Sequence, residues 1–297
     1  MVYKLVKKYK KHSGPLYAVT FSKKYNLLFT GGSDKVVATW DIEKEENTPL
    51  TIKTDSPILN LQLLNEDKHL FIGLFNGDFH LIDLETRKEI SVFSNHKLGV
   101  FASSYVQTYN RLIVGAGDGT LSIWDSKQFK LLKKHQLSNG KIRAIQVVDK
   151  EVFIGNSKGQ IFNFTISNLE EMRLFITLKH PIFCLNYHEN KNTLLIGDKN
   201  AHLTSVDLKT KNITDSIPAH NWPIYRVEWL NGAEFVTCSR DKIVKIWDAS
   251  SMKVKQRLCF PDFQGHLNSV NNLVSIPSIN SIVSVGDDKQ ICIWRKN

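Results

Sequence analysis

The fold of this chain is decided by residues 219–250, which read AHNWPIYRVEWLNGAEFVTCSRDKIVKIWDAS. After His220, the apolar run Ile224–Trp229 predicts one strand and Glu234–Ser239 predicts a second. A polar turn then leads into Ile243–Trp247, where apolar and polar residues alternate as they do in a third strand. The stretch therefore indicates an antiparallel sheet that begins after a histidine and ends at a Trp-Asp pair.

The same order of residues recurs along the whole chain at intervals of 40 to 47 residues. The positions in phase with the tryptophan are Trp40, Ile82, Trp124, Phe164, Val206, Trp247 and Trp294. Six residues before them stand Asp34, Asn76, Asp118, Lys158, Asn200, Asp241 and Asp288. Further upstream stand His12, Thr54, His96, His135, His180, His220 and His266. A fixed period of this length indicates a repeat architecture.

A period near 40–45 residues with His, Asp and Trp-Asp in that order is typical of four-stranded propeller blades. The chain resembles the WD-repeat β-propeller family over all 297 residues. Repeats one, six and seven match closely, whereas repeats two, four and five match in spacing more than in residue type. The resemblance implies an all-β fold, a seven-bladed β-propeller of four-stranded antiparallel blades in a single domain, residues 1–297.

The two ends of the chain complement each other. The last repeat ends at Trp294 with three strands and lacks an outer fourth. Val2–Tyr9 precedes the first histidine, and within it Leu5–Lys8 resembles the outer strand of repeat three at Leu131–Lys134. Because an unpaired strand edge favours association with other chains, we predict that the N-terminal strand completes the last blade. Its lysines then lie on the solvated outer edge.

The composition restricts the class of protein. A net charge of +10 and a hydrophobic content of 42% fit a soluble protein with some affinity for acidic partners. The chain has no uncharged apolar run of about 18 residues, and its first residues lack a secretory segment. The cysteines fall in predicted strands without the spacing of a zinc site, so we expect buried free thiols and a cytoplasmic location. They are Cys184, Cys238, Cys259 and Cys292.

Three repeats carry a histidine, a strand hydroxyl, a turn acid and a tryptophan in phase. These sets are His12, Thr30, Asp34 and Trp40; His220, Thr237, Asp241 and Trp247; and His266, Ser284, Asp288 and Trp294. Ser284 with His266 and Asp288 has the residue types of a hydrolase triad, but a triad also needs a reachable nucleophile and an oxyanion site. A buried indole, hydroxyl, imidazole and carboxylate can instead satisfy one another's hydrogen bonds. Three copies in phase favour this structural role, and we expect no enzyme activity.

No cofactor or metal site is predicted. The glycines of residues 115–119, GAGDG, fit a hairpin turn in repeat three, because the segment lacks the Lys-Ser/Thr end of a phosphate loop. His69, His188 and His202 form no pair with the spacing of two metal ligands on a helix.

The resemblance also implies where a partner binds. In WD-repeat proteins the face with the histidine loop and the acid turn, the top face, is commonly the binding face, and one residue early in each first strand points onto it. In this chain that position holds Tyr17, Leu59, Phe101, Arg143, Phe183, Tyr225 and Asn271. Four of these seven are aromatic, a residue type that is enriched at interfaces and also common in strands.

Basic residues lie close to the same positions, notably Lys141, Lys158 and Arg240. Aromatic and basic groups together suit an extended peptide with an apolar anchor and an acidic or phosphorylated side chain, although the same cations could act only as solubilising groups. The residues expected to bind the partner are Tyr17, Phe101, Arg143, Phe183, Tyr225 and Arg240. Trp222 and the connector 260–263 are secondary candidates.

The sequence thus predicts a non-enzymatic protein-interaction scaffold that is a monomer alone and works within a larger complex. The alternative is a module that binds nucleic acid or an anionic surface through its net charge of +10. Such binding would weaken steeply with salt.

Overall fold

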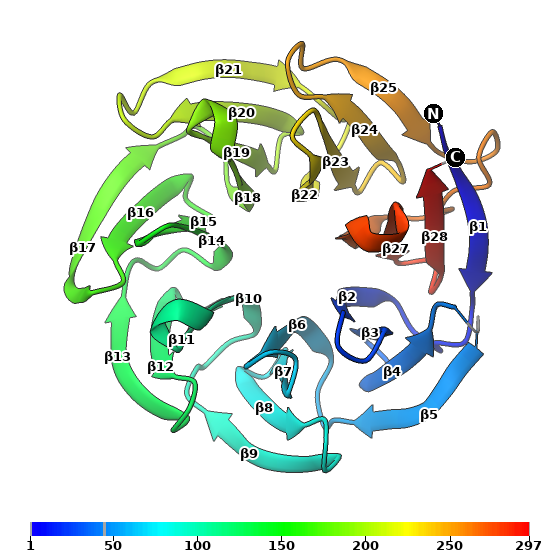
Figure 1. Ribbon diagram of the computed structural model, residues 1–297. Coiled ribbons are helices and arrows are strands. Elements are labelled where there is room, and N and C mark those ends of the chain that lie inside the picture. Colours follow the sequence, from blue (N-terminus) through cyan, green and yellow to red (C-terminus); the bar gives the residue numbers. More distant parts are fainter. Residues whose placement is uncertain (1, 44–45, 297) are drawn as a thin grey trace. The chain divides into compact units, whose positions relative to one another are not determined.

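The computed structural model describes residues 2–43 and 46–296. In this part the chain is all-β apart from three single-turn 3-10 helices, and it forms seven four-stranded antiparallel sheets (Figure 1). Each sheet is one blade, numbered in chain order by its first strand, and the predicted seven-bladed β-propeller is confirmed. The chain divides into two compact units, residues 1–17 with 180–297, and residues 18–179. The single domain over 1–297 stays a prediction.

The unit of residues 18–179 contains blades one to four, each with its strands side by side in chain order. Blade one, which begins two residues earlier, consists of β2 (Leu16–Ser22), β3 (Leu27–Gly32), β4 (Val36–Asp41) and β5 (Glu46–Lys53). Blade two consists of β6 (Ile58–Leu64), β7 (His69–Leu74), β8 (Asp78–Asp83) and β9 (Lys88–Ser94). Blade three consists of β10 (Val100–Val106), β11 (Arg111–Ala116), β12 (Thr120–Asp125) and β13 (Lys130–Gln136). Blade four consists of β14 (Ile142–Val148), β15 (Glu151–Asn156), β16 (Gln160–Thr165) and β17 (Asn168–Thr177).

The unit of residues 1–17 and 180–297 contains blades five to seven. Blade five consists of β18 (Ile182–His188), β19 (Thr193–Asp198), β20 (His202–Asp207) and β21 (Ile213–Pro218). Blade six consists of β22 (Ile224–Asn231), β23 (Glu234–Ser239), β24 (Val244–Asp248) and β25 (Val254–Leu258). Blade seven has the order β1-β28-β27-β26, with β1 (Tyr3–Tyr9), β26 (Val270–Ile276), β27 (Ser281–Gly286) and β28 (Ile291–Lys296).

Within each unit the cores lie between neighbouring blades. Blades two and three meet where the Trp124 indole contacts Phe79 edge to face, with ring centroids 5.1 Å apart. Glycine allows a close approach between blades three and four, since a Cβ atom on Gly115 would lie 2.4 Å from the Ile142 side chain. A glycine on one blade therefore leaves room for a branched side chain on the next, and this packing fixes the positions of blades three and four relative to each other.

The N-terminal strand completes the last blade, as the sequence predicted. β1 pairs with β28 in antiparallel register, with Tyr3 opposite Lys296 and Tyr9 opposite Ile291. The strand is also joined to blade six, because the Tyr3 backbone N–H donates to Gln256 Oε1 over 2.8 Å and the Gln256 side-chain amide donates to the Tyr3 carbonyl over 2.7 Å.

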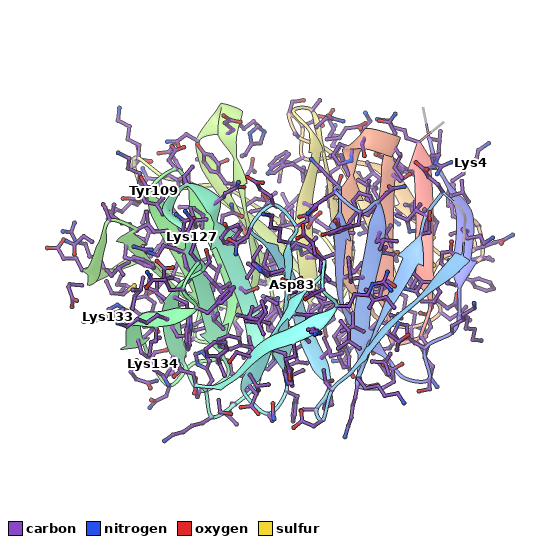
Figure 2. The ribbon with its side chains drawn as sticks, turned by 60° about the horizontal axis from the view of Figure 1, so that its bottom comes forward. Lys4, Asp83, Tyr109, Lys127, Lys133 and Lys134 are labelled. Carbon is purple, nitrogen blue, oxygen red and sulfur yellow. The ribbon has the colours of Figure 1, made fainter. Side chains whose placement is uncertain are left out.

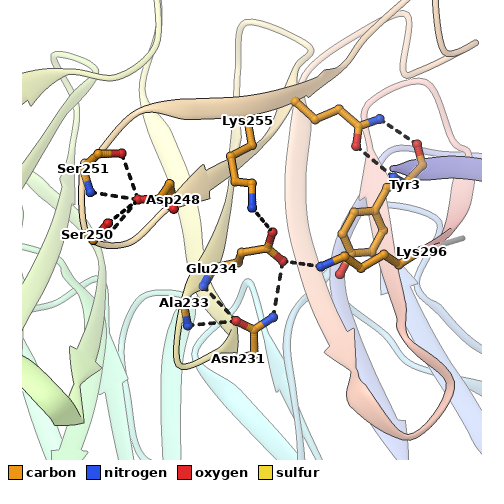
Figure 3. A network of polar contacts seen from close by, with 10 residues as sticks. Tyr3, Asn231, Ala233, Glu234, Asp248, Ser250, Ser251, Lys255 and Lys296 are labelled. Atoms are coloured by element: carbon orange, nitrogen blue, oxygen red, sulfur yellow. Dashed lines mark hydrogen bonds and ion pairs between the residues drawn. The ribbon is translucent and has the colours of Figure 1, made fainter. Parts of the chain in front are cut away.

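A buried carboxylate lies beside this junction. Figure 3 shows Glu234 between two lysines, Lys255 and Lys296, with Asn231 as a further donor. The Glu234 side chain is only 8% exposed, whereas Lys255 is 48% exposed. Burial opposes ionisation of this carboxyl, but the hydrogen bonds from both lysines and from Asn231 lower its pKa to about 2. Glu234 therefore stays charged and links strands β23, β25 and β28.

Lysines lie exposed on the outer strands, as Figure 2 shows for Lys4 on β1 and Lys134 on β13.

All four cysteines are free thiols, and burial raises the pKa of Cys184 to about 12. The prediction that all four lie in strands is wrong for Cys259, which follows the end of β25 and is half-buried. In the described ranges no helix has the length and apolarity that crossing a bilayer requires.

Candidate functional site

Blade six contains a buried chain of hydrogen bonds that ends at a tryptophan. The Trp247 indole donates to Thr237 Oγ1 over 2.8 Å. His220 lies 2.7 Å from the same hydroxyl through Nε2 and 2.8 Å from the Asp241 carboxylate through Nδ1. A neutral imidazole with its proton on Nδ1 satisfies both contacts, because the hydroxyl then donates to Nε2. The four groups thus form one continuous series of donors and acceptors.

Blade seven repeats this geometry. The same three contacts are made by Trp294, Ser284, His266 and Asp288 at 2.9 Å, and His266 Nδ1 also lies 3.0 Å from the second Asp288 oxygen. Ser284 and Thr237 are fully buried. A nucleophile must be reached by its substrate, so these hydroxyls act as structural acceptors and donors.

Burial sets the protonation of the blade six network. Burial lowers the pKa of His220, although the nearby Asp241 carboxylate acts in the opposite direction. Burial also acts to raise the pKa of Asp241, but the hydrogen bonds from His220 and from two backbone N–H groups outweigh it and lower that pKa. The pair therefore consists of a neutral imidazole and a carboxylate anion.

Blade one shares the bond from the indole to the strand hydroxyl, and blade three differs from the arrangement of blades six and seven. In blade one Trp40 donates to Thr30 Oγ1 over 2.8 Å, while His12 is buried and Asp34 lies in the turn before β4. In blade three the position of the strand hydroxyl holds Val114, and Trp124 donates instead to Ser122 Oγ over 2.8 Å. His96 lies 2.8 Å from Ser122 through Nε2 and 2.6 Å from Thr120 through Nδ1. The hydroxyl thus comes from the neighbouring strand, and the sequence pattern missed it.

The expected partner-binding positions coincide with an irregularity of the first strands. In blades two to seven the pairing register between the first and second strands skips one residue, which is a β-bulge. The skipped residues are Leu59, Phe101, Arg143, Phe183, Tyr225 and Asn271, all half-buried. A bulge leaves its residue out of the ladder and re-aims the side chain. In blades two to seven, the positions expected from the sequence are therefore the ones that lie outside the ladder between the first and second strands.

In the unit of residues 18–179, these positions bring an aromatic ring and a cation together. The Arg143 guanidinium lies over the Phe101 ring, 4.7 Å from its centroid. Phe101 and Leu98, which is 51% exposed, both lie beside Gly117, since a Cβ atom on Gly117 would be 2.9 Å from the Phe101 ring and 3.2 Å from Leu98 Cβ. Next to Arg143 in sequence, Lys141 is exposed. This apolar and basic group, Leu98, Phe101, Lys141 and Arg143, is called the blade three–four edge.

In the unit of residues 1–17 and 180–297, two aromatic contacts occupy the corresponding places. The Phe183 and Tyr225 rings are stacked with centroids 5.6 Å apart. The Arg240 guanidinium lies 5.1 Å from the centroid of Trp222, whose side chain is 55% exposed. These four residues are called the blade five–six edge. Tyr17, expected at the same kind of position in blade one, is half-buried.

The connector before blade seven divides into two parts. Phe260 is 59% exposed, whereas Phe263 packs against the buried cluster between blades six and seven. Only the first half of this secondary candidate therefore offers apolar surface to a partner.

The repeat pattern is matched by a known family. The WD40 profile (WD domain, G-beta repeat) matches residues 3–41, 87–125, 211–248 and 257–295, which together make just over half of the chain. Each matched range ends on the residue that follows a phased tryptophan. The chain belongs to the WD40 family. The family matches contain the first three strands of blades one, three and six and, except for Lys296, the strands β26 to β28 of blade seven, whereas blades two, four and five keep the fold with degenerate sequences.

Relatives of this WD40 chain include a protein named for its WD repeats and one named as a dynein chain. It is 23% identical to protein tipD of Dictyostelium discoideum, over 98% of this chain and 48% of that protein. It is 22% identical to WD repeat-containing protein 55 of Rattus norvegicus, over 80% of this chain and 62% of that protein. It is 25% identical to human dynein axonemal intermediate chain 2, over 70% of this chain and 39% of that protein. The chain thus spans roughly two fifths to three fifths of these proteins.

One exposed position of the WD40 repeat was only partly predicted from the sequence. Leu98 and Trp222 each stand two residues after a loop histidine, His96 and His220. Both side chains are more than half exposed, at 51% and 55%. An apolar residue two positions after a loop histidine was the signal that could have added Leu98 to the candidates.

Proposed function

We propose that this WD40 chain is a non-enzymatic platform that binds an extended peptide segment of a partner protein. Members of the family generally bind proteins and act within complexes. The observation that carries the proposal is the bulge in the first strands of blades three to six, where the skipped residues are aromatic or basic: Phe101, Arg143, Phe183 and Tyr225. Rigid sheets on either side of a bulge limit the ordering cost of binding.

The chemistry of the two edges favours a particular kind of peptide. At the blade three–four edge, exposed Leu98 and half-buried Phe101 supply apolar surface for an anchoring side chain. Arg143, held against Phe101, and exposed Lys141 supply positive charge beside that surface. Arginine binds carboxylates and phosphates strongly. The preferred ligand therefore carries an apolar anchor next to an acidic or phosphorylated residue.

A peptide library tests the blade three–four edge. Peptides that vary an aromatic or leucine anchor and a neighbouring acidic or phosphorylated residue are screened against the purified chain, and Kd is measured by fluorescence anisotropy. The double variant Phe101→Ala/Arg143→Ala should weaken the selected peptides at least about tenfold, or about 1.4 kcal/mol. Lys127→Ala is the charge-matched control, since Lys127 is an exposed cation in the turn between β12 and β13, at the opposite end of the same blade's strands.

The blade five–six edge is tested in the same way. Tyr225→Ala/Arg240→Ala removes one member of each aromatic contact there. Equal affinity of this variant and the parent chain for the selected peptides, together with unchanged binding in Phe101→Ala/Arg143→Ala, would show that the assigned blade edges do not bind. A cytoplasmic location remains part of the proposal, and microscopy of a tagged chain tests it.

Binding through net charge alone is distinguished by salt. Contact with nucleic acid or an anionic surface would weaken steeply between low and physiological salt, and Lys127→Ala would then weaken it as much as the loss of Arg143. Peptide binding that keeps its selectivity at high salt supports the platform.

A further inference from the structure

Three potential metal ligands meet at one end of blade five. His180 precedes β18, Asp198 ends β19 and His202 begins β20. One ligating atom from each side chain lies within 4.8 Å of those of the other two. The two imidazole rings are nearly parallel, 21° apart, with centroids separated by 6.0 Å. We propose that these residues bind one divalent first-row transition metal ion.

The surroundings of His202 already favour ligation. Its Nδ1 lies 3.1 Å from the Asn200 carbonyl oxygen, which can only accept a hydrogen bond. Nδ1 therefore carries the proton, and Nε2 keeps its lone pair. Metal-binding histidines are commonly oriented in this way by a backbone carbonyl on the other ring nitrogen.

Asp198 is also oriented from behind. Its Oδ1 accepts hydrogen bonds from the Asn200 and His202 backbone N–H groups, at 2.8 and 2.9 Å. Blade four has Asn156 at the same place, and Asn156 Oδ1 accepts from the backbone N–H groups two and four residues on at 2.9 and 3.0 Å. The turn thus folds with a neutral amide in blade four. The charge of the buried Asp198 carboxylate is not required by the turn, but it suits a cation.

His180 likewise has no role in a tryptophan network. In blade five the positions of the strand hydroxyl and the indole hold Ile196 and Val206, both fully buried, and the turn acid is replaced by Asn200. The partners that orient His220 in blade six are therefore absent from the described blade five. Ligation accounts for a histidine that the repeat does not otherwise use.

The ligand set indicates the class of ion. Imidazole and carboxylate together suit zinc and its first-row neighbours. Tetrahedral zinc with bonds of about 2.0–2.2 Å needs ligand atoms roughly 3.3–3.5 Å apart, so atoms that lie within 4.8 Å of one another must close in by up to about 1.5 Å. Two half-buried histidines on loop and strand ends can make that rotation. Three protein ligands leave a position for water or for a side chain of a bound partner.

The sequence pattern could not show this site. The other two histidines noted with His202 in the sequence, His69 and His188, lie at the start of β7 and at the end of β18. His180 and His202 meet only because β18, β19 and β20 pair as consecutive antiparallel strands.

Zinc titration of the untagged, chelator-treated chain tests the proposal. Calorimetry should find one equivalent bound, and zinc should raise the midpoint of thermal unfolding because it binds the folded state. Cobalt bound in place of zinc should give visible absorption bands. These bands should disappear when added zinc displaces the cobalt. His180→Ala, Asp198→Asn and His202→Gln should each lower the affinity for zinc by about 10- to 100-fold.

Two variants distinguish metal binding from a purely structural role of these residues. Asp198→Asn reproduces the turn of blade four, so circular dichroism and the metal-free unfolding midpoint should match the parent chain while zinc affinity falls. His80→Gln is the matched control, because His80 pairs with Glu89 in blade two and no third potential ligand joins them among the described residues, and it should keep the affinity. Absence of stoichiometric zinc binding, or equal affinity in Asp198→Asn and the parent chain, would overturn the site.

Discussion

Replacing Glu234 by glutamine tests how the N-terminal strand is held in blade seven. The substitution keeps the size of the side chain and removes its charge. In the folded chain the carboxylate accepts from Lys255 Nζ over 2.6 Å and from Lys296 and Asn231. Lys296 stands opposite Tyr3 in the β1–β28 register, so the loss of its partner loosens this junction.

The magnitude follows from the pKa of Glu234. Its pKa falls from 4.5 to about 2 on folding, which corresponds to about 3 kcal/mol of stability at neutral pH. Lys255 is 48% exposed, and solvent screening of that pair reduces the figure. We expect Glu234→Gln to lower the free energy of unfolding by about 2 kcal/mol at pH 7.

Urea denaturation over a pH series measures this loss. A carboxyl whose folded pKa is lowered stabilises the fold fully above its unfolded pKa, and this contribution disappears as the pH falls through the folded pKa. The difference between the parent chain and Glu234→Gln should therefore be constant from pH 7 to about 5.5 and shrink as the pH falls from 4.5 toward 2. Lys296→Met should cost much less in the Glu234→Gln background than in the parent chain, since the two act on one interaction.

Glu85→Gln is the matched control. Glu85 pairs with Lys24 at 2.6 Å, but both side chains are exposed, at 54% and 38%. Exposed pairs contribute about 0–1 kcal/mol, so this variant should remain close to the parent chain. Equal losses in Glu85→Gln and Glu234→Gln, or strict additivity of Glu234→Gln and Lys296→Met, would refute the argument from burial.

Three further outcomes are expected. Deletion of residues 1–10 should lower the thermal unfolding midpoint markedly, since it exposes the β28 edge, and an unchanged midpoint would contradict the pairing. Thr237→Val should cost about 1–3 kcal/mol in urea unfolding because the buried Trp247 indole loses its acceptor; a cost below 0.5 kcal/mol, by the same principle, would show that the indole finds another partner. Burial lowers the pKa of His96 to about 4, so the unfolded chain binds the extra proton, and stability should fall as the pH drops from 6.5 toward 4. His96→Gln should flatten that slope, and an unaltered slope would place the titration elsewhere.

The sequence was sufficient for the features that repeat. The phased positions around Trp247 predicted seven blades, and the three strands left at Trp294 predicted the pairing of β1 with β28. The same phasing located the residues at each first-strand bulge, such as Phe101 and Tyr225. Repetition makes a prediction at one blade transferable to the others, because each blade meets the same steric demands.

The sequence was not sufficient where partners are distant or substituted. Glu234 meets Lys296 from 62 residues away, and no spacing rule connects them. The blade three hydroxyl moves from the second strand to Ser122 on the third, since either strand can bring an oxygen to the Trp124 indole. His135 was placed in phase with the loop histidines, but it lies within β13, and its ring contacts the Leu169 carbonyl oxygen. Such exchanges preserve hydrogen bonding while changing the residue that provides it.

The irregular blades explain where a repeat fold can acquire chemistry. In blade six, replacing His220 by a residue that cannot accept a hydrogen bond there would leave the buried Thr237 hydroxyl without an acceptor, at a cost of about 1–3 kcal/mol. Blade five fills the same space with Ile196 and Val206, which need no hydrogen bonds. No tryptophan network in the described blade five depends on His180. Its side chain can therefore lie beside Asp198 at the end of the blade without loss of core stability. A blade that replaces its tryptophan network with aliphatic packing can therefore place ionisable side chains at its edge without weakening its interior, and this is where we expect chain-specific function to differ from the family's common scaffold.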